Sequence, residues 1–213
     1  MSVTPEELGR QLRQPEGALG LKVAEGMNKT NAQIIQYCQE ALALVDGEQL
    51  LEVGPGNGAH AADLLAGLPR CRYLGLDSAS AMVAAAREKP HPQLAFMEGD
   101  LLAFTPAQLF DKVLTINTAY FWQPLAPALA QLNRCLKLGG TLVLGVRSRT
   151  TMASQPQFAE GFCFFDGPEL ASALESCGFR VSWQKRPERS VTILGNVLEK
   201  EALIFTAIKE AAC

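Results

Sequence analysis

An acidic residue and three glycines lie close together in the first third of the chain. Glu52 ends an apolar run, and Gly54, Gly56 and Gly58 follow it at alternate positions in "LLEVGPGNGAH". Glycines in a turn after a strand let the backbone approach a ligand closely, and such turns often bind phosphate. A carboxylate at the strand end would instead repel phosphate and attract an ammonium group. We therefore predict a ligand with a positive charge near this turn and no phosphate.

A second carboxylate, Asp77, follows the apolar run "YLGL". A carboxylate at the end of the neighbouring strand can accept both hydroxyl groups of a ribose. The alternative is that Asp77 is a helix N-terminal charge next to Ser78. Together with Glu52, Asp77 predicts an amine-bearing nucleoside as the ligand.

Alternating strands and helices must position these carboxylates. Strands are expected at "QLLEV", "CRYLGLD", "QLAFMEGD", "DKVLTIN" and "TLVLGV". Helices are expected at "GAHAADLLAGL", "ASAMVAAAREK" and "PLAPALAQLNRCLKL", the last of them ended by Gly139-Gly140. This alternation predicts a parallel sheet covered on both faces, with ligands at the carboxyl ends of its strands.

The two ends of the chain follow other patterns. Residues 1–27 are polar and predict a loosely held arm with one short helix from Pro5 to Arg13, followed by a helix from Thr30 to Val45. After a helix at "PELASALESCGF", the segments "RVSWQKR" and "EALIFTAIK" predict two neighbouring antiparallel strands at one sheet edge. The segment 147–167 is long for a connection, which is typical of functional loops.

Composition excludes several classes of protein. A chain of 213 residues with a net charge of −3 predicts one domain without affinity for nucleic acid or anionic membranes. The apolar runs are too short for a membrane helix, and the N-terminus does not resemble a signal peptide, so a cytoplasmic location is expected. Six dispersed cysteines and two histidines predict free thiols and no metal site.

Five segments, in order, resemble the motifs of class I S-adenosylmethionine-dependent methyltransferases. They are "LLEVGPGNG", "GLDSASAM", "MEGDLLAF", "FDKVLTINTAYFW" and "LKLGGTLVLG", the last with Leu138 where proline is usual. The resemblance spans about residues 27–209. It implies a Rossmann-like α/β fold, a doubly wound seven-stranded sheet that is mostly parallel with an antiparallel last strand. It also implies a single methyltransferase domain over 1–213, in which 1–45 covers the cofactor and 46–213 forms the core.

The resemblance implies S-adenosylmethionine as cofactor and a set of residues that bind it. Asp77 would bind the ribose, Met82 would lie near the adenine, Asp100 would accept from the adenine amino group, and the Leu101 backbone would reach the ring. "MNKTN" and "NTAYFW" are similar to segments of a group of small bacterial methyltransferases, in which the first would close over the methionine end; helix capping is the alternative for Asn28 and Asn31. The full set is Met27, Asn28, Asn31, Glu52, Gly54, Gly56, Gly58, Asp77, Ser78, Met82, Gly99, Asp100, Leu101 and Asn117.

The catalytic residue is not evident from the sequence. The positive sulfur already activates the methyl group, so the protein mainly positions the nucleophile and needs a base only if that nucleophile is protonated. Asn117 and Tyr120 are candidates, with Tyr120 as pocket wall an equal alternative. Thr118 and Ala119 replace the two prolines of the NPPY motif, so methylation of a nucleobase amino group is not supported. His60 either faces the carboxylate side of the cofactor or is a surface helix residue, and the second is expected.

The expected activity is methyl transfer to a small-molecule acceptor. A nicotinamide-dependent oxidoreductase, using NAD or NADP, is disfavoured by Glu52 and the glycine spacing, and a non-catalytic S-adenosylmethionine-binding module is a further alternative. Arg147 and Arg149 could pair with an acidic acceptor group, although solvated charges are the more frequent outcome. The aromatic residues of the fourth motif and the long loop belong to the core or line an apolar acceptor pocket: Phe121, Trp122, Phe158, Phe162, Phe164 and Phe165. The sequence does not indicate an oligomeric state.

Overall fold

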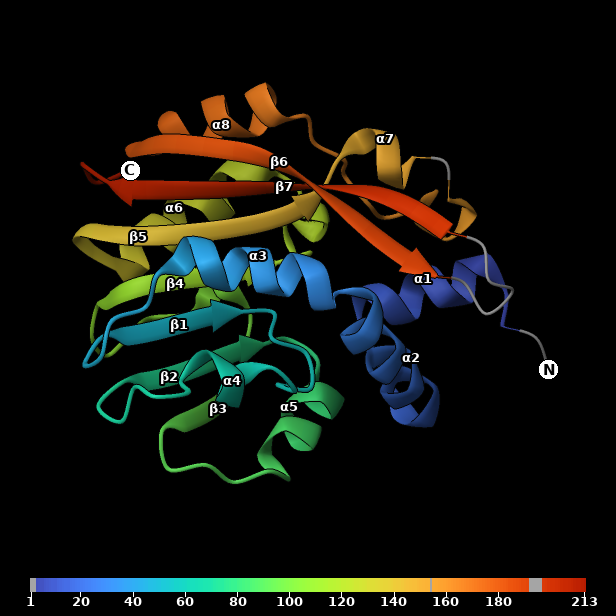
Figure 1. Ribbon diagram of the computed structural model, residues 1–213, viewed down its shortest axis with the longest axis horizontal. Helices are drawn as coiled ribbons and strands as arrows, with labels where there is room; N and C mark the ends of the chain where they lie inside the picture. Colours follow the sequence, from blue (N-terminus) through green and yellow to red (C-terminus); the bar gives the residue numbers. More distant parts are fainter. Residues whose placement is uncertain (1–2, 154, 192–196) are drawn as a thin grey trace.

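A twisted sheet with helices on both faces forms the centre of the molecule in a computed structural model, which describes residues 3–153, 155–191 and 197–213 (Figure 1). The strand order is β3-β2-β1-β4-β5-β7-β6. Strand β7 runs antiparallel to β5 and β6, whereas the other neighbouring strands are parallel. This confirms the predicted doubly wound sheet and its antiparallel last strand. The strands are β1 Gln49–Val53, β2 Arg72–Asp77, β3 Leu94–Glu98, β4 Phe110–Ile116, β5 Leu136–Arg147, β6 Phe179–Val191 and β7 Val197–Lys209.

The helices vary widely in length. None in the described part of the chain is long and apolar enough to cross a membrane. The α-helices are α1 Pro5–Arg13, α2 Gly17–Thr30, α3 Ala32–Leu42, α4 Ala61–Leu64, α5 Ser80–Arg87, α6 Leu125–Cys135, α7 Arg149–Met152 and α8 Gly167–Glu175. Short 3₁₀ turns among the described residues are η1 Leu101–Ala103, η2 Ala119–Phe121 and η3 Pro156–Phe158.

Two apolar cores lie on opposite faces of the sheet. On one face, α6 and α8 bury leucines such as Leu129 and Leu170 against the sheet. On the other face, α3 buries Ile34 and Cys38 against Leu114 of β4 and its neighbours. Removing these side chains from water is the main term that holds the helices to the sheet. Packing on both faces holds the central strands, and therefore their carboxyl ends, in place.

The sheet reverses its direction of growth at β1, which lies between β2 and β4. Ligands of open α/β sheets bind outside the carboxyl ends of the strands at such a point. Helices α1 and α2 lie beyond these strand ends, at the right of the molecule in Figure 1. The N-terminal segment is thus placed over the expected ligand site.

The structure corrects the prediction of a loose N-terminal arm. The helix from Pro5 to Arg13 is confirmed, but residues 17–30 form a second helix, α2. Small residues let α2 pack closely: Ala24 is buried beside Ala79 and Met82, and a side chain at Gly20 would collide with the backbone of Pro15. These contacts are tertiary, so the local sequence did not indicate them.

Three predicted helix boundaries are wrong. Helix α3 ends at Leu42 and not at Val45, because Ala43 adopts the left-handed conformation (φ 44°) and Val45 is left exposed. Helix α6 ends at Cys135, and β5 begins at Leu136, so the strand runs through the Gly139-Gly140 pair that was expected to end the helix. Pairing of Leu136 with Phe110 of β4 explains this early start. The helix expected after the glycine turn contains only the four residues of α4.

Candidate functional site

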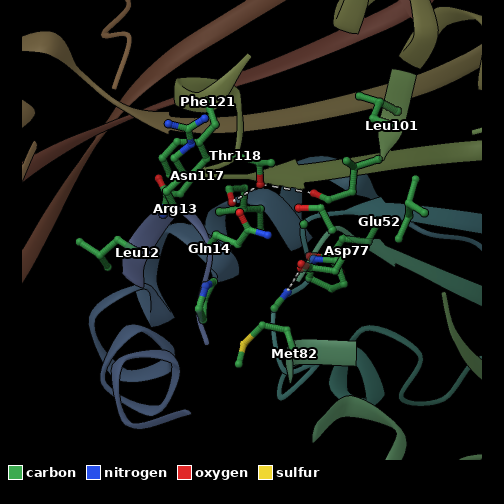
Figure 2. A pocket seen from close by; sticks show the side chains of 18 of the residues that line it. Leu12, Arg13, Gln14, Glu52, Asp77, Met82, Leu101, Asn117, Thr118 and Phe121 are labelled. Carbon is green, nitrogen blue, oxygen red and sulfur yellow. Dashed lines mark hydrogen bonds between the residues drawn. The ribbon is translucent and has the colours of Figure 1, made fainter. Parts of the chain in front are cut away.

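A cavity of about 540 Å³ lies between the carboxyl ends of the central strands and the N-terminal helices. Figure 2 shows Glu52 and Asp77 on the strand side and Leu12 and Gln14, from the end of α1 and the residue after it, on the opposite side. This contribution of residues 12–15 was not predicted, because no sequence motif indicates it. The residues expected to bind the cofactor line the cavity, with the exception of Gly58: Met27, Asn28, Asn31, Glu52, Gly54, Gly56, Asp77, Ser78, Met82, Gly99, Asp100, Leu101 and Asn117.

The three glycines of the first turn differ in what surrounds them. All have positive φ angles, of 76°, 59° and 62° for Gly54, Gly56 and Gly58. A Cβ atom on Gly54 would collide with the side chain of Thr118, and one on Gly58 would lie 2.7 Å from the ring of Phe96. A Cβ on Gly56 meets nothing within 4 Å. Gly54 and Gly58 therefore permit close packing, whereas Gly56 leaves open space at the cavity.

The Asp77 carboxylate is held in place by backbone groups. Its two oxygens accept hydrogen bonds from the backbone N–H of Gly56 at 2.8 Å and of Ala79 at 2.9 Å. Burial raises the pKa of Asp77, while these two N–H groups act in the opposite direction. Each carboxylate oxygen has a further lone pair, so Asp77 can still accept hydrogen bonds from a ligand in the cavity.

Glu52 is almost fully buried and has two side-chain partners. The hydroxyl of Tyr73 donates to Oε2 at 2.8 Å, and Nε2 of His60 lies 2.8 Å from Oε1. Burial tends to lower the pKa of His60, but the Glu52 carboxylate outweighs this effect, and the pKa of His60 is raised. The expectation that His60 is a surface residue is therefore wrong: its side chain is 16% exposed and lines the cavity. His60 is the N-cap residue of α4, two residues after the last glycine of the turn, and from there its ring reaches Glu52.

Asn117 follows β4 and combines a left-handed backbone with an unpaired amide. Its φ of 57° is unusual for a residue other than glycine. The Tyr120 oxygen accepts the backbone N–H of Arg147, and the Tyr120 hydroxyl donates to Oδ1 of Asn117 at 3.1 Å. Nδ2 of Asn117 is buried and has no partner among the described residues. A buried donor without a partner at the end of a central strand is typical of a ligand site.

These features fit a nucleoside with an amine and no phosphate. Two carboxylates at adjacent strand ends supply acceptors for hydroxyl and ammonium groups. The open space at Gly56 and the residue Asn117 complete the lining. The donor set could hold S-adenosylmethionine, whose amino acid and ribose parts offer matching groups.

A second cavity of about 520 Å³ adjoins the first. The two share the lining residues Leu12, Met27, Asn31, Asn117 and Phe121. The second cavity is further lined by Tyr120, Phe158, Phe162 and Lys200. Of the two catalytic candidates, Tyr120 lines the second cavity and not the first, whereas Asn117 lines both.

Arg147 also lines the second cavity, but its guanidinium group is engaged within the protein. It forms a buried ion pair with Glu188 at 2.8 Å and donates to Oδ1 of Asn31 and to the carbonyl of Thr30. The expectation of a solvated charge is wrong for Arg147. Arg149 is a surface residue that pairs with Asp166 and Glu169.

Comparison with known proteins identifies the class of enzyme. Residues 50–140 match the family model described as a methyltransferase domain. An uncharacterized methyltransferase, YdaC, of Bacillus subtilis is 26% identical over 155 residues, which are 72% of this chain and 83% of YdaC. The trans-aconitate 2-methyltransferase of Deinococcus radiodurans is 36% identical over 107 residues, half of this chain and 40% of that enzyme.

A solved structure shares the fold. The N-methyltransferase NodS of Bradyrhizobium japonicum, in complex with S-adenosylhomocysteine, aligns over 99% of this chain and 100% of NodS with a TM-score of 0.68 and 18% identity. The matched methyltransferase domain and the named relatives, together with the shared fold, support an S-adenosylmethionine-dependent methyltransferase. Its cofactor is S-adenosylmethionine, of which S-adenosylhomocysteine is the product. The match to trans-aconitate 2-methyltransferase covers only 40% of that enzyme. The match therefore does not identify the acceptor of this protein.

Proposed function

We propose that the protein transfers the methyl group of S-adenosylmethionine to a small-molecule acceptor bound in the second cavity. The observation that supports this most is that the two cavities adjoin at Asn117 and Met27. One cavity can then hold the donor and the other the acceptor, with their reacting atoms at the shared wall. Holding two reactants in line can lower the barrier of such a transfer by about 7–11 kcal/mol.

The residues at the first cavity have separate roles in this proposal. Asp77 accepts the ribose hydroxyls, and Met82, Asp100 and the backbone of Leu101 contact the adenine. Glu52 attracts the ammonium group, and this attraction is stronger than in water because both groups lie in a medium of lower dielectric constant. The remaining residues of the cofactor set shape the turn and the methionine end: Met27, Asn28, Asn31, Gly54, Gly56, Gly58, Ser78, Gly99 and Asn117.

When bound, S-adenosylmethionine supplies a methyl group that its positive sulfur has activated. The protein then has to orient the acceptor and exclude water. Phe121 and Leu12 present apolar surface to both cavities, and Asn117, whose buried Nδ2 has no partner among the described residues, lines both as well. In this proposal Asn117 orients a bound oxygen or nitrogen atom, and Tyr120 positions Asn117.

A small acceptor is supported over a macromolecule. The second cavity is lined by α1 and α2 of the same chain and has a volume suited to a small ligand. The net charge of −3 does not favour nucleic acid. Trans-aconitate, the acceptor in the name of one relative, is itself a small molecule.

Calorimetry with S-adenosylhomocysteine tests the cofactor site. We expect one binding site per chain, and Asp77→Ala should weaken binding by about tenfold or more, since a charged group loses two ligand hydrogen bonds. Asp46→Ala is the matched control, because Asp46 pairs with Arg70 outside the cavity lining. Tight binding of NAD without binding of S-adenosylhomocysteine would support the oxidoreductase alternative.

A screen of acceptors with radiolabelled S-adenosylmethionine tests the transfer itself. The proposal predicts label in a small organic product. Cofactor binding without transfer to any acceptor of the screen would favour a non-catalytic module. Transfer to protein or nucleic acid alone would contradict the small-molecule acceptor.

A further inference from the structure

The walls of the second cavity are largely aromatic on one side. The rings of Phe121 and Phe162 lie 4.8 Å apart between centroids, and those of Phe158 and Phe162 lie 5.0 Å apart, both nearly edge to face. Leu8 and Val23 line the cavity from α1 and α2. Such a surface gains free energy by covering an apolar or planar molecule.

One basic side chain, Lys200, adds charge to this apolar lining. It belongs to β7 and is paired across the strands with Glu188 of β6. Arg147 also lines the cavity, but Glu188 neutralises its charge through two hydrogen bonds, at 2.8 and 2.9 Å. The group of Arg147, Glu188 and Lys200 therefore has a net charge of +1, which Lys200 supplies.

The surroundings of Lys200 favour an added anion. Burial lowers the pKa of Lys200, Arg147 lowers it further, and Glu188 acts in the opposite direction. Glu199 also lines the cavity, but it is exposed and pairs with Arg189 at 3.3 Å. A half-buried ammonium group in such a place is stabilised when a ligand brings a negative charge to it.

We infer that the acceptor is a small organic acid whose apolar body packs against Phe121, Phe158 and Phe162 and whose anionic group pairs with Lys200. This inference rests on the proposed function, because it assigns the second cavity to the acceptor. The residue that pairs with the acid is thus Lys200, near the C-terminal end of the chain, and not Arg147 or Arg149, the basic residues that the sequence suggested. The two arginines are occupied by Glu188, Asp166 and Glu169.

The test compares acids with their amides. Arylalkanoic and alkanoic acids of increasing chain length, and the corresponding neutral amides, are titrated by calorimetry into the full chain saturated with S-adenosylhomocysteine. We expect at least one chain length to bind as the acid about tenfold more tightly than as the amide. Lys200→Met should remove this preference, and Lys200→Arg should retain it.

Two further variants separate charge from packing. Phe162→Leu should weaken the acid and the amide by the same factor, because both lose the aromatic wall. Lys137→Met is the control, because Lys137 pairs with Asp111 and does not line the cavity. Thermal unfolding of each variant establishes that it is folded.

The outcomes distinguish this inference from the proposed function. Equal binding of acids and amides, or an acid preference that survives Lys200→Met, overturns the role of Lys200. Binding of no acid in the series overturns the acid class, even when S-adenosylhomocysteine still binds and methyl transfer to another small molecule is found. If the unmodified protein does not bind S-adenosylhomocysteine, the proposed function itself is overturned.

Discussion

Nε2 of His60 lies 2.8 Å from Oε1 of Glu52, at the edge of the first cavity. Burial acts to lower the pKa of His60, but the carboxylate prevails and the pKa is raised. A group whose pKa is raised on folding stabilises the folded state fully below its unfolded pKa of about 6.5, and this contribution is lost as the pH rises through the folded value.

The first prediction is that His60→Gln removes this pH dependence. The difference in unfolding free energy between the unmodified protein and the variant should be largest near about pH 6 and should shrink toward about pH 9. Urea unfolding at several pH values measures it. Because the chain has only two histidines, a proton NMR titration with His91→Gln assigns the signals. A midpoint for His60 below about 6.5 would contradict the prediction.

The second prediction separates the glycines of the first turn. Gly58→Ala should lower the unfolding free energy by about 2–4 kcal/mol, because the new Cβ combines a positive φ with a collision against Phe96. Gly56→Ala should cost only about 1–2 kcal/mol, because it meets open space.

Although Gly56→Ala should affect stability less than Gly58→Ala does, it should weaken cofactor binding. Its methyl group would occupy the cavity beside Asp77, and affinity for S-adenosylhomocysteine should fall by about tenfold or more. Gly67→Ala is the control, with positive φ, open space and no place in the cavity lining. Equal affinities for the two variants would argue that Gly56 does not face the cofactor.

The third prediction concerns the buried ion pair of Arg147 and Glu188. Their side chains are 10% and 2% exposed. Glu188→Gln leaves a buried guanidinium group without its counter-charge and should lower the unfolding free energy by about 3–5 kcal/mol. Glu210→Gln, which breaks the exposed pair with Arg180, should change it by less than about 1 kcal/mol. Chemical denaturation measures the unfolding free energy of both variants. Equal losses would contradict the prediction that the buried pair contributes more to stability than the exposed pair.

The fourth prediction concerns the left-handed backbone at Asn117. Asn117→Gly adopts φ 57° without strain, so the unfolding free energy should stay within about 1 kcal/mol of the unmodified value. The lost amide donor should weaken S-adenosylhomocysteine binding by about three- to tenfold. Ala43→Gly, at the other non-glycine residue with positive φ in the described part of the chain, should stabilise the protein and leave binding unchanged. A strongly destabilised Asn117→Gly would show that the amide is structural.

Local patterns account for what could be predicted. The apolar strands and the amphipathic helices between them require no knowledge of distant residues, so the order of the sheet elements and the carboxylates at two strand ends could be predicted. The boundaries that failed were decided by distant contacts. Pairing of Leu136 with Phe110 extends β5, and packing of Ala24 against α5 orders α2.

The sequence by itself indicated the class of fold and a nucleoside ligand with an amine, because Glu52 is contiguous with the glycine turn and Asp77 ends the next apolar run. The resemblance of five motifs then indicated the cofactor. Tertiary structure alone decided what faces the acceptor. It brought Arg147 to Glu188 and to Thr30, 117 positions away, and it placed Lys200 at the second cavity. Spacing along the chain does not specify which charges neutralise one another, because that depends on how strands and helices pack after the chain has folded.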